Sequence, residues 1–151
     1  MLSTDSQATN VIDDKVRIAG TVRTLDEGVR DMAEERIRAI VESTAAAYGC
    51  TAEITYERGY PVTVNDEKAA ELAAEIAEAV AGAGKVHWGR PPMMGAEDFS
   101  YMLNERPGAY VHVGNGDTAK VHQVTYDFND EAIPYGCSFF AELVERRMPA
   151  A

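Results

Sequence analysis

The chain has 151 residues, of which 46% are hydrophobic and 26% charged, and its formal net charge is −11. This length falls in the usual range for one domain with a core of its own, and the composition is that of a globular protein. Because so much negative charge repels phosphate backbones and anionic lipid, we expect neither nucleic acid nor a membrane as a partner.

The N-terminus and the cysteines bear on where the protein works. Residues 1–10 are too polar to contain the apolar centre of a signal peptide, and no apolar run approaches the ~18 residues of a membrane span. Cys50 and Cys137 are too few for a disulfide framework and lack the spacing of a zinc finger. We therefore expect a cytoplasmic protein in which both thiols fill the core.

The first part of the chain predicts a strand, a helix and a second strand. Residues 1–14 are expected to be an irregular lead-in, and residues 15–24 alternate between apolar and polar side chains as a half-buried strand does. Asp26 can cap a helix that ends at Gly49, and residues 51–57 alternate again. The predicted apolar face of the helix is Val29, Met32, Ala33, Ile37, Ile40, Val41 and Thr44.

Gly59-Tyr60-Pro61 interrupts this pattern and is the expected boundary. A helix is predicted from about Asp66 to Ala83, with a short strand at residues 86–87 after it. Its predicted apolar face is Ala69, Leu72, Ala73, Ile76 and Val80.

Three further elements are predicted after residue 90. They are a short helix over residues 97–104, a buried strand over 109–113 and a last helix from about Asp130, with Pro134 in its first turn, where proline is tolerated. The last helix is expected to bury Ile133, Cys137, Phe140 and Val144. Two short strands are too few for an independent sheet, so this half is expected to end a larger domain.

Carboxylates, a histidine and glycine-bounded turns are densest between Pro91 and Pro134. His122 is the one histidine beside a carboxylate cluster, and it can be either a metal ligand or a surface histidine. His112 lies in the predicted apolar strand and is expected to be a core histidine. Glu97, at a helix start, equally suits stabilisation of the helix dipole.

Several motifs follow one another in the later part of the chain. They are Met94-Gly95-Ala96-Glu97-Asp98-Phe99, Pro107-Gly108-Ala109, Gly114-Asn115-Gly116, His122 and Asp127-Phe128-Asn129-Asp130-Glu131-Ala132. In this order they resemble the carboxyl-terminal third of the M20-type metallo-amidohydrolases, and the closest branch is the hippurate hydrolase and N-acyl-amino-acid amidohydrolase group. Earlier in the chain, residues 10–13 and 20–26 resemble the second half of that family's lid or dimerisation domain.

The resemblance implies an enzyme with two divalent metal ions, zinc or manganese, that hydrolyses the amide of a small-molecule N-acyl amino acid. It matches His122 to the last metal-binding histidine. It matches Asn10 and Arg23 to lid residues that reach a site in the partner subunit, where the arginine holds the substrate carboxylate and the asparagine polarises the amide oxygen. A planar guanidinium suits that carboxylate. Glu97 matches a position that lines the pocket.

The family's other metal ligands and its catalytic glutamate precede the residues matched here, and no Cys-Gly-His-Asp motif occurs in the sequence. We therefore expect a fragment without catalytic residues or stably bound metal of its own, which is inactive alone. The expected fold class is α/β, with an α+β partial lid over residues 1–60 and the closing part of a mixed α/β catalytic domain over 61–151. Association through the lid segment as a homodimer, or with a missing N-terminal half, is expected from open strand edges. The alternative is a non-catalytic dimerisation or interaction module derived from the family.

Overall fold

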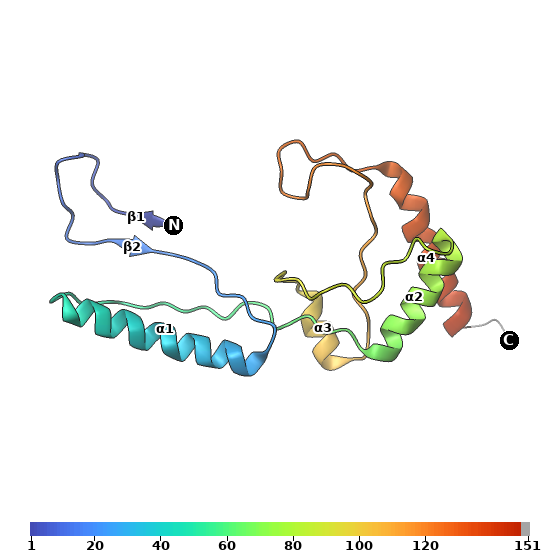
Figure 1. Ribbon diagram of the computed structural model, residues 1–151, viewed down its shortest axis with the longest axis horizontal. Coiled ribbons are helices and arrows are strands. Elements are labelled where there is room, and N and C mark those ends of the chain that lie inside the picture. Colours follow the sequence, from blue (N-terminus) through green and yellow to red (C-terminus); the bar gives the residue numbers. More distant parts are fainter. Residues whose placement is uncertain (149–151) are drawn as a thin grey trace. The chain divides into compact units, whose positions relative to one another are not determined.

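The computed structural model describes residues 1–148, which divide after Arg58 into two compact units. The first unit is Met1–Arg58 and the second begins at Gly59. The described residues are mostly helical, with one two-stranded sheet (Figure 1). The assignment of the units to a lid and to a catalytic domain stays a prediction.

The sheet of the first unit is formed by β1 (Leu2–Ser3) and β2 (Arg17–Ile18), which are antiparallel. Leu2 lies opposite Ile18, and the amino group of Met1 donates a 2.7 Å hydrogen bond to the carbonyl of Ala19. Sequence reasoning treated residues 1–14 as irregular and was wrong for β1. It expected a strand over residues 15–24, of which only β2 pairs.

Helix α1 (Glu27–Ala47) confirms the predicted helix and its cap. The carboxylate of Asp26 accepts a 2.9 Å hydrogen bond from the amide of Val29, which satisfies one of the free donors of the first turn. The helix ends where Gly49 adopts a φ of 68°, a left-handed conformation that glycine tolerates without steric cost.

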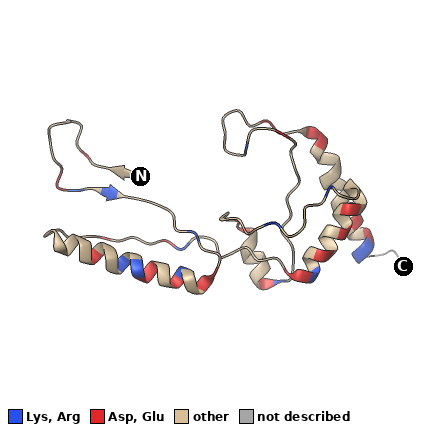
Figure 2. Cartoon of the chain, in the orientation of Figure 1, with Lys and Arg blue, Asp and Glu red and all other residues tan. Residues whose placement is uncertain are grey.

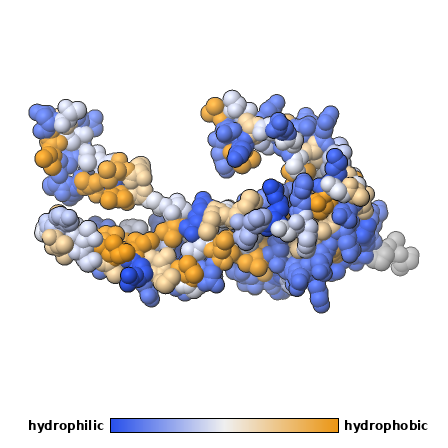
Figure 3. Space-filling model, in the orientation of Figure 1, coloured by the Kyte–Doolittle hydropathy of each residue, from blue (hydrophilic) through white to orange (hydrophobic). Residues whose placement is uncertain are grey.

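The predicted apolar face of α1 is not buried within the first unit. Ala33 and Ile37 are half-buried, whereas Met32 and Ile40 remain 55% and 56% exposed. Hydrophobic residues accordingly gather on the surface of α1 (Figure 3). Periodicity therefore placed the apolar stripe correctly, but within the unit no element covers it.

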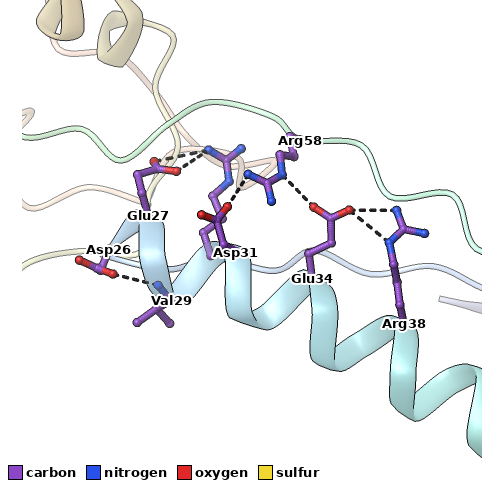
Figure 4. Close-up of polar contacts among 8 residues, drawn as sticks. Asp26, Glu27, Val29, Asp31, Glu34, Arg38 and Arg58 are labelled. Carbon is purple, nitrogen blue, oxygen red and sulfur yellow. Dashed lines mark hydrogen bonds and ion pairs between the residues drawn. The ribbon is translucent and has the colours of Figure 1, made fainter.

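Residues 51–58, which we call the strap, are held against α1 by charged side chains (Figure 4). Arg58 donates to Asp31 at 2.6 Å and to Glu34 at 2.8 Å, and Arg38 donates to the other oxygen of Glu34 at 2.9 Å. These hydrogen bonds, from Arg58 first and then Arg38, lower the pKa of the Glu34 carboxyl. The hydrogen bonds that Arg58 donates to Glu34 and Asp31 in turn raise the pKa of the Arg58 guanidinium.

Arg38 also binds the strap directly. It donates to the carbonyl of Ile54 at 3.5 Å, and its guanidinium carbon lies 6.0 Å from the centre of the Tyr56 ring. The strap therefore meets the charged side of α1. It forms no strand within the described residues, so the second strand of the expected strand–helix–strand unit is wrong.

The second unit contains α2 (Glu67–Ala81), α3 (Phe99–Glu105), a 3-10 turn η1 (Asp130–Ala132) and α4 (Ile133–Arg147). Helices α2 and α4 pack against each other. Asp66 caps α2 by accepting from the amide of Ala69 at 2.9 Å, and Gly82 ends it with a φ of 92°. Pro134 lies in the first turn of α4 as predicted.

The core of the second unit lies on α2. Ala73 and Ile76 are 7% and 0% exposed, which confirms the predicted apolar face of this helix. Helix α4 turns a different face inward from the one expected. Its half-buried positions are Gly136, Phe139, Glu142 and Leu143, whereas Ile133, Cys137, Phe140 and Val144 are exposed.

The remaining predicted strands do not form in the part of the chain that the structure describes. Residues 86–87 and 109–113 have no ladder partner, and residues 111–113 are exposed rather than buried. A strand exists only when a neighbour accepts and donates its main-chain bonds, so alternation alone was not sufficient. Both cysteines are exposed, which corrects their expected role in the core.

Charge is distributed differently on the helices of the two units (Figure 2). Acidic and basic residues alternate along α1, whereas α2 has Glu67, Glu71, Glu75 and Glu78 against the single base Lys68. None of the helices among residues 1–148 combines the length and the apolar character needed to cross a membrane.

Candidate functional site

His122 lies in the segment between α3 and α4 that carries most of the candidate chemistry. It has a φ of 70° and is the one described residue other than glycine with a positive φ. Its side chain is exposed, and no hydrogen bond to it is formed within residues 1–148. Both ring nitrogens are therefore available to a metal or to solvent.

The turn around His122 is closed by its neighbours on either side. The amide of Lys120 donates to the side-chain oxygen of Gln123 at 2.9 Å, and the amide of Gln123 donates to the carbonyl of Lys120 at 3.2 Å. The amide of Tyr126 then donates to the carbonyl of Gln123 at 3.0 Å. His122 is thus at the third position of a four-residue turn.

The side chain of Asn115 joins the two ends of the loop that contains this turn. Its oxygen accepts from the amide of Asn129 at 2.7 Å, and its nitrogen donates to the carbonyl of Asp127 at 2.8 Å. The same nitrogen lies 2.9 Å from the hydroxyl of Thr118. A hollow of about 460 Å³ beside these bonds is lined by Thr118, Asp127, Phe128, Asn129 and Asp130.

A second asparagine, Asn65, lies before α2 and binds main chain at the start of the segment between α3 and α4 in the same way. The side chain of Asn65 accepts from the amide of Tyr110 at 2.8 Å and donates to its carbonyl at 3.0 Å. The amide of Asp66 donates to the carbonyl of Gly108 at 2.9 Å. These bonds attach residues 108–110 to the chain just before α2 in place of a strand ladder.

Glu97 is half-buried directly before α3, and its carbonyl accepts from the hydroxyl of the buried Ser100 at 2.6 Å. Burial, and next the negative charge of Glu97, raise the pKa of the Tyr110 hydroxyl. The Tyr110 ring lies 5.1 Å from the exposed His112, so the expectation of a core histidine at 112 is wrong. Glu97 therefore borders an aromatic cluster, and its substrate role stays a prediction.

Asn10 and Arg23 lie in the first unit and both are exposed. Asn10 is in a turn, and Arg23 lies between β2 and α1 outside regular structure. Their predicted contacts with a substrate stay predictions, as does the ligand role of His122.

Within residues 1–148, no three side chains of histidine, cysteine, aspartate or glutamate converge where a metal ion could bind. The described residues therefore do not fit a complete metal centre. The exposed, unpartnered imidazole of His122 does fit a single ligand of a centre whose other ligands come from elsewhere.

Sequence reasoning missed Asn65 and Asn115 as organising residues of this segment. Glycine on both sides of Asn115 indicated a turn, but a turn asparagine gives no sign of which distant main chain it binds.

Comparison with known proteins shows the family. The sequence model of the family described as peptidase family M20/M25/M40 matches residues 6–146. Hippurate hydrolase of Campylobacter jejuni is 31% identical over 136 residues, which cover 90% of this chain and 36% of that protein. N-acetylcysteine deacetylase of Bacillus subtilis is 34% identical over 134 residues, 89% of this chain and 34% of that protein.

Thermostable carboxypeptidase 2 of Saccharolobus solfataricus is 36% identical over 112 residues, which cover 74% of this chain and 28% of that protein. The chain thus spans about a third of the length of these curated relatives. No solved structure matches it. Because the family model covers nearly all of the sequence, the chain belongs to peptidase family M20/M25/M40.

Proposed function

We propose that this chain forms the closing part of a metal-dependent amidohydrolase that cleaves the amide of N-acyl amino acids. The observation that supports this most directly is the exposed imidazole of His122, unpartnered within residues 1–148 and located in the region that the family model matches. The relatives' names include a hippurate hydrolase and an N-acetylcysteine deacetylase, which agree with an N-acyl amino acid as substrate. The family also implies an α/β catalytic domain.

In this proposal His122 is one ligand of a centre of two divalent ions, zinc or manganese. When bound, such ions supply a Lewis acid and an activated water. The other ligands and the general base lie outside the described residues, because these contain no group of three potential ligands. The chain alone should therefore be inactive.

Arg23 is proposed to hold the substrate carboxylate, because a guanidinium offers two parallel donors to it. Asn10 is proposed to donate to the amide oxygen, and Glu97 to line the pocket. Each role predicts that substitution by alanine weakens binding of a benzoyl-amino acid to the assembled enzyme.

Assembly is proposed to involve a second copy through the first unit or a separate N-terminal half. The exposed apolar residues of α1 and the two outer edges of the short sheet are the surfaces that would be covered (Figure 3). A single monomeric species at micromolar concentration in analytical ultracentrifugation would contradict the homodimer.

The test of the enzymatic proposal combines metal analysis with an assay. We expect the purified chain to retain little zinc or manganese by mass spectrometry and to hydrolyse none of a panel of benzoyl- and acetyl-amino acids. Stoichiometric metal with turnover would show that inactivity of the chain is wrong. Turnover that persists in His122→Ala would show that the ligand role of His122 is wrong.

The second candidate is a non-catalytic dimerisation module that retains the first unit of the family fold. The absence of a three-ligand group among residues 1–148, together with the exposed face of α1, favours it. Stable homodimers in which added zinc leaves the His122 ring signals unchanged would support this candidate over the first.

A further inference from the structure

Asn115 makes an unusually complete set of side-chain bonds for an exposed loop. Its amide oxygen accepts from Asn129, and its amide nitrogen donates to Asp127 and Thr118, all between 2.7 and 2.9 Å. An asparagine amide offers two N–H donors and an oxygen with two acceptor lone pairs, so three of its four bonding positions are used. We call the two bonds from Asn115 to the main chain of Asp127 and Asn129 the clasp.

The clasp joins the two ends of residues 116–128 with hydrogen bonds to the main chain, as a pair of strands would. Bonds to one main-chain donor and one main-chain acceptor, two residues apart, fix both the separation and the direction of the returning chain. Without them the loop ends would be free to separate, and the interior of the loop would sample many more conformations.

His122 lies within the closed loop and has the one positive φ among the described residues other than glycine. Its φ of 70° is uncommon for a residue with a side chain, because in the left-handed region the Cβ atom comes too close to the following carbonyl oxygen. A disfavoured conformation persists only where surrounding bonds hold it. The Lys120–Gln123 turn supplies local bonds, and the clasp keeps that turn inside a closed loop.

We infer that Asn115 is a positioning residue for His122: the clasp closes residues 116–128 and thereby holds the histidine in its left-handed backbone conformation with the imidazole exposed. The effect of the clasp on the backbone of His122 depends only on the hydrogen bonds of Asn115 and of the Lys120–Gln123 turn. The consequence for metal binding rests on the proposed function.

The experiment is nuclear magnetic resonance on the isotope-labelled full chain. Scalar couplings across the bonds from Asn129 to Asn115 and from Asn115 to Asp127 would detect the clasp directly. Three-bond couplings at His122 report its φ. In Asn115→Ala we expect both clasp couplings to vanish, His122 to move to negative φ and the loop amides to exchange roughly tenfold faster, as expected for the loss of two hydrogen bonds.

Three matched variants separate positioning from general stability. Asn115→Asp keeps the acceptor for Asn129 and loses the donor to Asp127, so an intermediate effect on His122 is expected. Thr118→Val removes the hydroxyl that accepts from Asn115 and donates to the carbonyl of Ala119 at 3.3 Å, and should leave the clasp couplings in place. Asn104→Ala, an exposed asparagine of α3, should change none of these signals.

Amide protection of α2 and α4 distinguishes a local effect from unfolding. Absent clasp couplings in the unsubstituted chain, or an unchanged φ of His122 in Asn115→Ala, would overturn the inference. If Asn115→Ala loses the helices, the folded Asn115→Asp decides: unchanged His122 couplings there overturn it as well.

Addition of zinc ions alone to the unsubstituted chain tests the ligand role separately. Because His122 is at most one ligand among residues 1–148, its ring nitrogens are expected to shift only weakly and only at excess zinc, without retention of the metal on purification. The absence of any shift with an intact clasp would count against the proposed function and leave the positioning role standing. The reverse result, zinc-dependent shifts with no effect of Asn115→Ala on φ, would overturn only the positioning role.

Discussion

The strap of the first unit and the segment from Gly108 to Asn129 of the second were both expected to contain a strand, and they are held in place by different forces. The strap is attached through guanidinium–carboxylate pairs centred on Arg58 and Glu34. The later segment is attached through the amide side chains of Asn65 and Asn115, which bond directly to main chain.

This difference determines how well each attachment specifies geometry. Ion pairs between long, partly exposed side chains are sensitive to salt and pH and weak in water, because fixing two long side chains in one geometry costs entropy. A short amide that bonds a main-chain donor and acceptor at once fixes register as a strand neighbour would. We therefore predict that the segment with His122 is held more firmly than the strap, and the following changes test that prediction.

The largest effect is expected from the core of the second unit, which lies on α2. Ile76→Ala removes the one fully buried apolar side chain of α2, and such truncations destabilise by about 2–5 kcal/mol. Hydrogen exchange should show loss of protection in α2 and α4. The control is Ile40→Ala, whose side chain is 56% exposed in α1. Equal loss of protection in α1 would mean that the two units do not unfold separately.

Asn65→Ala should release residues 108–110 by removing two hydrogen bonds, with a loss of about 1–2 kcal/mol in the local opening free energy. The measurement is amide exchange at Tyr110 relative to α4. Asn65→Asp retains the acceptor for the Tyr110 amide. Its exchange rate at Tyr110 should lie between those of the unsubstituted chain and Asn65→Ala. An unchanged exchange rate at Tyr110 would show that the amide does not hold this segment.

The helix caps provide an equal perturbation to each unit. Asp26→Ala and Asp66→Ala each remove a 2.9 Å hydrogen bond to the first turn of a helix, which typically contributes about 1 kcal/mol. Each should reduce protection in the first turn of its own helix, α1 or α2. Asp26→Ser and Asp66→Ser should retain most of the protection of the first turn, because a serine hydroxyl also accepts from its amides.

The smallest effect is expected in the strap. Arg58→Gln should raise amide exchange over residues 51–58 by about twofold to fivefold, the size typical of exposed ion pairs. Sodium chloride at about 1 M should mimic this change, because it shortens the screening length to about 3 Å. The bonds of Asn65 and Asn115 should be insensitive to that salt.

The strap should also respond to acid. Because Arg58 and Arg38 lower the pKa of Glu34 in the folded chain, the attachment is fully present above the ordinary glutamate range and is lost as pH falls through the lowered pKa. The protection factors of the strap amides, which correct for the pH dependence of intrinsic exchange, should therefore fall at acid pH, and Arg58→Gln should weaken this dependence. A strap with the same pH dependence in both chains would contradict the assignment.

The sequence by itself determined the helices, because their signals are local. Asp26 was readable as a cap, Gly49 as an end, Asp66 as the approximate start of α2, and Ile76 as part of its apolar face. The ordered motifs between residues 10 and 132 identified the family, because they extend over most of the chain. His122, Asn10, Arg23 and Glu97 were selected by that resemblance, and their roles remain predictions.

Only the tertiary structure decided which segments pair and which faces are covered. Alternation predicted strands over residues 51–57 and 109–113, but a strand requires a partner that local sequence does not name. The exposed Phe140 and the half-buried Phe139 of α4 show the same limit, because a helix stripe becomes a core only where another element covers it. Asn115 is the sharpest case, since its bonds to Asp127 and Asn129 exist only once the loop between them has closed.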